Sequence, residues 1–341
     1  KMKIILLLIT IGTVFGGKCP LNKVITPCRC GRESWQRDVI ICNSSVNHIS
    51  EIFDLASKNL TSQEEKHFEL IAIEIPTNKS EEESTLNDNS FADFTFYQFF
   101  ASRIKKISNK AFGKSSDSIQ SFWCEKCWLE NDSPKYNFWN VFGKMNQLTS
   151  LTIDLNVNEI PSNAFKIANQ SQLGLIEIRS SKQNLTIKSN AFNNLKNLVY
   201  IFFVKINFNR FEKQSLNFDS NSLNQNEKIL IEFISSNLNG DSFEPGTFDG
   251  VKRPIGLEFF ADFDSNPSEI KVIPESVFKS LLNNTKSCIN SRVDCLNCKN
   301  YWLIRDHKEQ QLKYPFCTET NYSNRILFHQ EIQTKLKSKC N

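Results

Sequence analysis

The sequence is poor in the residues and patterns on which common catalytic sites depend. Its four histidines, His48, His67, His307 and His329, lie far apart along the chain. It contains no His-Glu-x-x-His, no Gly-x-Ser-x-Gly and no phosphate-binding glycine loop. We therefore predict a protein that is not an enzyme, with no catalytic residues, no metal site and no cofactor.

An excess of one charge is also missing, because 41 Lys and Arg residues face 37 Asp and Glu residues. This balance predicts neither a nucleic-acid partner nor a polybasic membrane patch. No apolar run after the first residues approaches the ~18 residues of a membrane span. Residues 1–17 begin with basic residues, continue as a short apolar stretch and end in small residues, which is typical of a secretory signal peptide. We expect a mature chain that is soluble and extracellular.

Cysteine, in contrast, is abundant, and in an exported chain eleven cysteines indicate disulfide bonds. The residues form a first group, a middle pair and a last group: Cys19, Cys28, Cys30 and Cys42; Cys124 and Cys127; Cys288, Cys295, Cys298, Cys317 and Cys340. The cysteine clusters near both ends suggest disulfide bonds that stabilise the two ends of the fold. The odd count leaves one thiol free, or paired with a cysteine outside this sequence.

One apolar template, U-x-x-U-x-U with U a large apolar residue, recurs through the middle of the chain. Clear copies begin at Phe68, Phe96, Ile119, Leu148, Leu173 and Leu198, and weaker ones at Lys228 and Pro254. A second motif, U-x-x-x-small-Phe, alternates with the first. Its copies end at Phe91, Phe112, Phe165, Phe192, Phe248 and Phe278. Each turn thus supplies one strand and one Phe-anchored return segment. A single turn cannot bury these residues, so the pattern predicts a stacked solenoid.

The repeat resembles the leucine-rich-repeat superfamily over residues 67–280, and Ile160–Phe165 and Ile187–Leu195 are similar to its extracellular branch. The resemblance implies an α/β solenoid, a horseshoe of about eight strand-bearing turns with a parallel concave sheet. It also implies an N-terminal cysteine cap with a first return segment over residues 18–66, and a C-terminal cysteine cap over residues 281–341. The chain has a further similarity to secreted arthropod proteins like the non-catalytic subunit of oplophorus-luciferin 2-monooxygenase.

Two finer expectations follow from this resemblance. The asparagine or cysteine ladder position of the family is matched by Asn156 and Cys127, whereas the other turns have Pro76, Ile104, Ser181, Ile206, Ser236 and Asp262. The caps of the family imply the pairs Cys19–Cys30 and Cys28–Cys42 at one end. At the other end they suggest Cys295–Cys317 and Cys298–Cys340, with Cys288 unpaired.

In a strand of period two, the U residues point inward and the residues between them point outward onto the concave sheet. The middle outward column reads Ala72, Phe100, Trp123, Thr152, Glu177, Phe202, Glu232 and Glu258. Exposed aromatic residues on one face are typical interface anchors, and we predict binding residues on this sheet: Phe100, Trp123, Tyr200, Phe202, Glu177, Glu232 and Glu258. The alternative is a register slip of one residue, which would put Phe202 or Phe260 in the core.

Glycosylation sequons begin at Asn43, Asn59, Asn78, Asn131, Asn169, Asn184, Asn283 and Asn321, and we expect N-linked glycan on several of them. None of these asparagines falls in the eight strand segments. The predicted binding face is therefore free of glycan.

The segment Trp123–Cys127 has the Trp-Cys-x-x-Cys form of thiol oxidoreductases, which place the first cysteine at a helix N-terminus. The repeat register instead puts Cys124 inward and Cys127 at the ladder position, so both should be buried and structural. We therefore predict a secreted, non-catalytic binding or scaffold protein whose partner is a protein, such as a catalytic or receptor chain. The alternatives are a thiol-disulfide oxidoreductase using Cys124 and Cys127, and a truncated receptor ectodomain.

Overall fold

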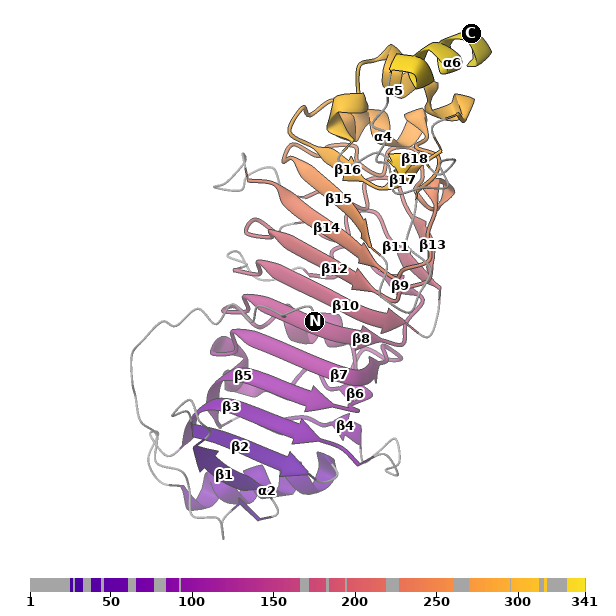
Figure 1. Ribbon diagram of the computed structural model, residues 1–341. Helices are drawn as coiled ribbons and strands as arrows, with labels where there is room; N and C mark the ends of the chain where they lie inside the picture. The colour runs from indigo at the N-terminus through magenta and orange to yellow at the C-terminus, as the bar shows by residue number, and fades with distance from the viewer. Residues whose placement is uncertain are drawn as a thin grey trace.

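The chain folds as a parallel β-solenoid in which successive turns add one strand each to a single sheet (Figure 1). The computed structural model describes residues 25–26, 28–32, 38–43, 46–60, 66–76, 84–91, 93–165, 172–181, 184–193, 195–218, 227–260, 270–294, 296–312, 316–317 and 330–340. In these residues the sheet has 11 strands in the order β1-β2-β3-β5-β7-β8-β10-β12-β14-β15-β16. Every neighbouring pair is parallel except β1 and β2.

The eight segments predicted from the repeat are all strands of this sheet. They are β3 (His67–Glu74), β5 (Thr95–Ser102), β7 (Ser121–Leu129), β8 (Ser150–Leu155), β10 (Leu175–Ser181), β12 (Tyr200–Val204), β14 (Ile229–Ile234) and β15 (Ile255–Phe260). The inward U residues of these strands are buried, as Ile71, Leu151 and Ile176 illustrate. The sheet also extends beyond the predicted repeats, through β1 (Arg29–Arg32) and β2 (Asp38–Asn43) at one end and β16 (Cys288–Asn290) at the other.

Short elements form the return side of each turn. They are β4 (Thr85–Leu86), β6 (Lys106–Ile107), η3 (Gly113–Asp117), α3 (Phe138–Phe142), β9 (Glu159–Ile160), β11 (Leu185–Ile187), β13 (Phe208–Phe211), η4 (Gly240–Ser242) and α4 (Glu275–Leu282). Three of the strands make a second parallel sheet in the order β13-β11-β9, and β4 pairs with β6. The core lies between these elements and the main sheet.

The phenylalanines of the second sequence motif form part of this core. All six are buried, and rings from adjacent turns touch: the ring centroids of Phe165 and Phe192 lie 5.5 Å apart in a stacked arrangement. Two residues before these rings, Asn163 and Asn190 have φ angles of 55° and 57°. Asparagine tolerates this left-handed conformation better than most residues, so the Ser-Asn-Ala-Phe phrase fits the tight turn that aims the ring inward.

The described N-terminal end consists of the β1–β2 hairpin and helix α2 (Val46–Asn59), whose Ile52 and Phe53 are buried in the core. The predicted disulfide Cys28–Cys42 is confirmed. Cys30 is also disulfide-bonded, whereas its predicted partner Cys19 lies outside the described residues.

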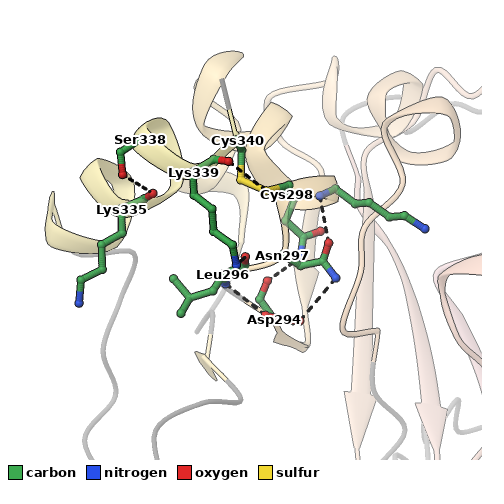
Figure 2. The surroundings of a disulfide bond; sticks show 10 residues. Asp294, Leu296, Asn297, Cys298, Lys335, Ser338, Lys339 and Cys340 are labelled. Atoms are coloured by element: carbon green, nitrogen blue, oxygen red, sulfur yellow. Dashed lines mark hydrogen bonds between the residues drawn. A yellow bond between two sulfur atoms is a disulfide. The ribbon is translucent and has the colours of Figure 1, made fainter.

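At the C-terminal end, the remaining elements are β17 (Arg292–Val293), η5 (Cys298–Asn300), α5 (Tyr301–Arg305), η6 (Glu309–Gln311), β18 (Phe316–Cys317) and α6 (Gln330–Cys340). The predicted disulfide Cys298–Cys340 is confirmed and ties α6 to η5 (Figure 2). Beside it, Lys339 Nζ donates a hydrogen bond to the Leu296 carbonyl at 3.3 Å. Cys288 is unpaired, as predicted, and it is buried. The predicted pair Cys295–Cys317 involves side chains that lie outside the described part of the chain.

The segment assigned to a signal peptide, residues 1–17, also lies outside the described residues. Among the helices that the structure does describe, none is both long enough and apolar enough to cross a lipid bilayer.

Candidate functional site

The outward face, meaning the side chains of strands β3 to β15 that point away from the core, has the predicted middle column. Strand register links Ala72, Phe100, Trp123, Thr152, Glu177, Phe202, Glu232 and Glu258 as direct neighbours. The alternative of a one-residue slip is wrong, because Phe203 and Phe259 are the buried inward residues while Phe260 is 38% exposed. The repeat therefore predicts not only the strands but also which side chains share a face.

At one part of the outward face, Phe100 and Trp123 pack edge to face with ring centroids 5.6 Å apart. The guanidinium of Arg179 lies 5.1 Å from the Trp123 ring centroid, and its Nε donates to Glu177 at 2.7 Å. Glu177 also accepts a hydrogen bond from the Thr152 hydroxyl at 3.3 Å. The Trp123 indole N–H is buried and has no hydrogen-bond partner among the described residues. These side chains are only partly exposed, because they cover one another.

A second part of the outward face exposes larger apolar surface. Tyr200 is 42% exposed, and its ring stacks on that of Phe202 at 6.0 Å with 7° between the planes. Phe260 is the other exposed aromatic residue on the face, and Leu55 on α2 is the remaining exposed large apolar residue of the described chain. Of the four aromatic residues predicted for binding, Tyr200 alone is strongly exposed, whereas Phe100, Trp123 and Phe202 are half-buried.

Two carboxylates lie beside these aromatic residues. Glu232 on β14 and Glu258 on β15 are direct register partners. Burial, reinforced by the negative charge of Glu258, raises the pKa of Glu232 to about 7. Glu232 therefore holds a proton well above the pH at which an ordinary glutamate releases it.

Three positions that the alternation places outward are instead buried: Ser102, Asp154 and Gly256, which has no side chain to expose. For Asp154 the cause is local: the register between β7 and β8 shifts after Cys124, and Lys126 and Trp128 adopt positive φ angles of 55° and 50°. The Asp154 carboxylate turns in to accept a hydrogen bond from the Lys126 backbone N–H. Strict alternation fails where the β7 chain bulges.

The bulge contains a disulfide between Cys124 and Cys127, both fully buried. This agrees with the inward position predicted for Cys124 and the ladder position predicted for Cys127. Cys124 belongs to a strand and not to a helix N-terminus. The pair is thus placed in the core, away from the outward face.

The described sequon asparagines, Asn43, Asn59, Asn131, Asn184 and Asn283, are all exposed. The other three, Asn78, Asn169 and Asn321, lie outside the described residues. Asn43 ends β2, where it pairs in register with Glu74, so a sequon does sit at the first strands of the sheet. From β3 to β15 the outward face contains none.

No family model matches this chain, and no curated protein matches it. Within the described residues, no group of three or more His, Cys, Asp or Glu residues is arranged to hold a metal ion. The functional interpretation therefore depends on the outward face itself.

Proposed function

We propose that the chain is a secreted, non-catalytic leucine-rich-repeat protein that binds a protein partner, such as a catalytic or receptor chain, through its outward face, the concave face in that class. The observation that carries the proposal is the register-aligned column of aromatic and acidic side chains on a rigid sheet. Aromatic anchors held in place lose little conformational freedom on binding and dominate the energetics of many interfaces. Function is assigned from this surface, since the fold alone specifies none.

The leucine-rich-repeat assignment is supported by the hydrogen bonds of one ladder position. The Ser236 hydroxyl donates to the Phe203 carbonyl at 3.0 Å and accepts from the Ile206 N–H at 3.2 Å. It thereby satisfies backbone groups of the preceding turn, which buried polar groups require. Ser236 occupies the ladder position, which the family repeat fills with asparagine or cysteine, and its hydrogen bonds link this turn to the preceding one.

Secretion is supported by disulfides near both ends of the chain and in its middle, because such bonds persist in oxidising compartments. Exposed sequon asparagines are consistent with N-linked glycan. The sequon-free stretch from β3 to β15 leaves room for a large partner.

The test begins with the immobilised full chain, which is used to isolate its partner from the native fluid. The dissociation constant of the purified partner is then measured for Tyr200→Ala and for the matched control Leu55→Ala, an exposed apolar residue on α2. Loss of an anchor worth about 2 kcal/mol weakens binding roughly 30-fold. We expect that loss for Tyr200→Ala and less than about a twofold change for the control. Equal effects of the two substitutions would contradict the proposal.

The oxidoreductase alternative is disfavoured by the burial of both Cys124 and Cys127, since a substrate thiolate must reach one of the sulfurs. An insulin-reduction assay separates the two functions, and activity that disappears in Cys124→Ser would support the enzyme. A truncated receptor ectodomain would require a longer transcript that encodes a membrane span.

A further inference from the structure

The return side of the solenoid, formed by the short elements opposite the main sheet, is interrupted at α3. One small sheet contains β4 and β6, another contains β9, β11 and β13, and the α3 turn lies between them in the chain (Figure 1). On either side of the interruption, backbone hydrogen bonds join successive turns, from Asn109 N to Lys135 O and from Asn163 N to Asn190 O. No such bond joins residues 133–145 to the described loop that contains Asn163. The α3 turn is therefore separated from the turn that follows it.

A cleft of about 510 Å³ lies at this interruption. Three successive turns contribute to its lining, with side chains that include Asn109, then Asn137, Asn140 and Lys144, then Ser162 and Asn163. Its volume lies within the ~300–1,000 Å³ of typical ligand sites and accommodates one or two sugar rings. The core separates the return elements from the main sheet, so the cleft is distinct from the outward face.

The polar side chains of the cleft retain hydrogen-bonding capacity. Asn140, Ser162 and Asn163 are exposed, and their side chains have no hydrogen-bond partner among the described residues. Asn137 Oδ1 accepts a hydrogen bond from the Asn140 N–H at 3.4 Å, which leaves the amide NH₂ of Asn137 able to donate. Each amide offers both donors and an acceptor, and hydroxyl groups require the same combination. The lining therefore favours a ligand that is rich in hydroxyl groups.

The lining also contains Trp139, whose side chain is only 5% exposed. The indole N–H of Trp139 is buried and has no hydrogen-bond partner in the described part of the chain. A buried donor without an acceptor costs free energy, and an acceptor atom from a ligand would recover it. Pro161 and Ala164 add apolar surface to the same cleft. A sugar ring matches this mixture, because it combines apolar C–H faces with polar edges.

The charge of the expected ligand follows from Lys144. It is the only charged side chain among the described residues that line the cleft, and it is exposed. Its Nζ donates to the Asn109 carbonyl at 2.7 Å, which leaves two N–H bonds for a ligand. With no aspartate or glutamate in this lining to neutralise it, Lys144 gives the cleft a positive potential that favours an anion.

We propose that this cleft binds a pyranose that carries a carboxylate, as in uronic and sialic acids, either free or at the end of a glycan. The amides and Ser162 bind the hydroxyl groups, Lys144 pairs with the carboxylate, and the Trp139 N–H donates to an oxygen of the ring or its substituents. The site goes beyond the function proposed for the outward face, and its test does not depend on that function.

The probes are methyl β-D-glucuronide and the α-methyl glycoside of N-acetylneuraminic acid, and the methyl ester of each is its neutral control. The indole ¹H–¹⁵N signals of the full chain labelled with ¹⁵N-tryptophan are followed during titration at neutral pH, and Trp139→Phe assigns the signal of Trp139. We expect a saturable shift of this signal with at least one acid, and an affinity at least about threefold higher than that of its ester, as for a solvent-screened ion pair.

The absence of a saturable shift with both acids, or equal affinities of the acids and their esters, would overturn the proposal. The free sugar acids are titrated beside the glycosides to distinguish the two sources of the ligand. Tighter binding of a free acid would identify a free sugar, whereas equal or tighter binding of its glycoside would identify the end of a glycan.

Three variants complete the design, and circular dichroism verifies that each one folds. Lys144→Met should lower the affinity for the acid to that for the ester. Lys114→Met, which changes an exposed lysine of η3 outside the cleft, should bind as the unmodified chain does. Asn140→Asp adds a negative charge with little change of shape and should weaken binding of the acid more than that of the ester. An unchanged ratio of the two affinities in Lys144→Met, or equal losses in the two lysine variants, would overturn the assignment.

Discussion

Replacing Glu232 by glutamine should increase the free energy of unfolding more at pH 8 than at pH 4.5. The pKa of Glu232 is raised from 4.5 to about 7 by burial and by Glu258. Below pH 4.5 the carboxyl is protonated in both the folded and the unfolded chain, so it causes no penalty. As the pH rises towards 7, the unfolded chain releases this proton while the folded chain retains it, and unfolding becomes more favourable. Glutamine has no proton to release and escapes the penalty.

The size of the effect follows from the change in pKa. One pKa unit corresponds to about 1.4 kcal/mol, so the rise to about 7 sets an upper limit of about 3 kcal/mol. Glu232 is partly exposed, and solvent screening reduces this to on the order of 1–2 kcal/mol. When the pH rises from 4.5 to 8, the free energy of unfolding of the variant should therefore increase by that amount relative to that of the unmodified chain.

Urea unfolding at the two pH values, followed by circular dichroism, measures the difference. Glu212→Gln is the control. Burial acts to raise the pKa of Glu212, but hydrogen bonds from Lys188 and the Ser189 N–H outweigh it and hold the pKa below its usual value. The effect of that substitution should thus stay constant over this range. A stability difference for Glu232→Gln that is the same at both pH values would show that the carboxyl is not desolvated.

Three further outcomes are expected. Phe165→Ala should lower the free energy of unfolding by about 3–5 kcal/mol in urea denaturation, because it removes a buried ring that stacks on its neighbour in the next turn. The Cys124–Cys127 disulfide should resist reduction and alkylation until denaturant is added, and labelling by mass spectrometry in native buffer would contradict its burial. The double variant Cys298→Ser, Cys340→Ser should raise hydrogen exchange in α6 at least about tenfold while the main sheet keeps its protection; unchanged exchange in α6 would show that other contacts hold the helix.

The repeat predicts the strands and their register because it encodes two periods at once, alternation within a strand and recurrence between turns. The outer strands were not predicted, for a physical reason visible in their residues. In β2, Ile40 and Cys42 occupy inward positions, but Arg37 stands where the template requires a large apolar residue. In β16, Ile289 is inward, whereas Lys286 and Ser291 fill the flanking template positions. Terminal turns pack on one neighbour only and tolerate polar residues where inner turns do not.

The sequence predicts which residues lie on the outward face, but it does not predict how exposed each side chain is. Sequence alternation places Phe100 and Trp123 outward, yet Arg179 covers the Trp123 ring from two strands away, a contact that no local pattern contains. The inward turn of Asp154 likewise depends on the bulge of the neighbouring strand. Exposure depends on side-chain reach across strands, and local periodicity carries no information about that reach.

The continuous register of the middle column, from Trp123 to Glu232, also fixes distances along the face in nearly equal steps. Each strand adds about 4.8 Å, so the four steps from Trp123 on β7 through β8, β10 and β12 to Glu232 on β14 span roughly 19 Å. A partner that touches both residues must carry its own groups at that spacing. Deleting one whole repeat between them would shorten the separation by a single step and preserve the orientation of every remaining side chain. The separation of any two residues in the column is thus a multiple of the strand spacing.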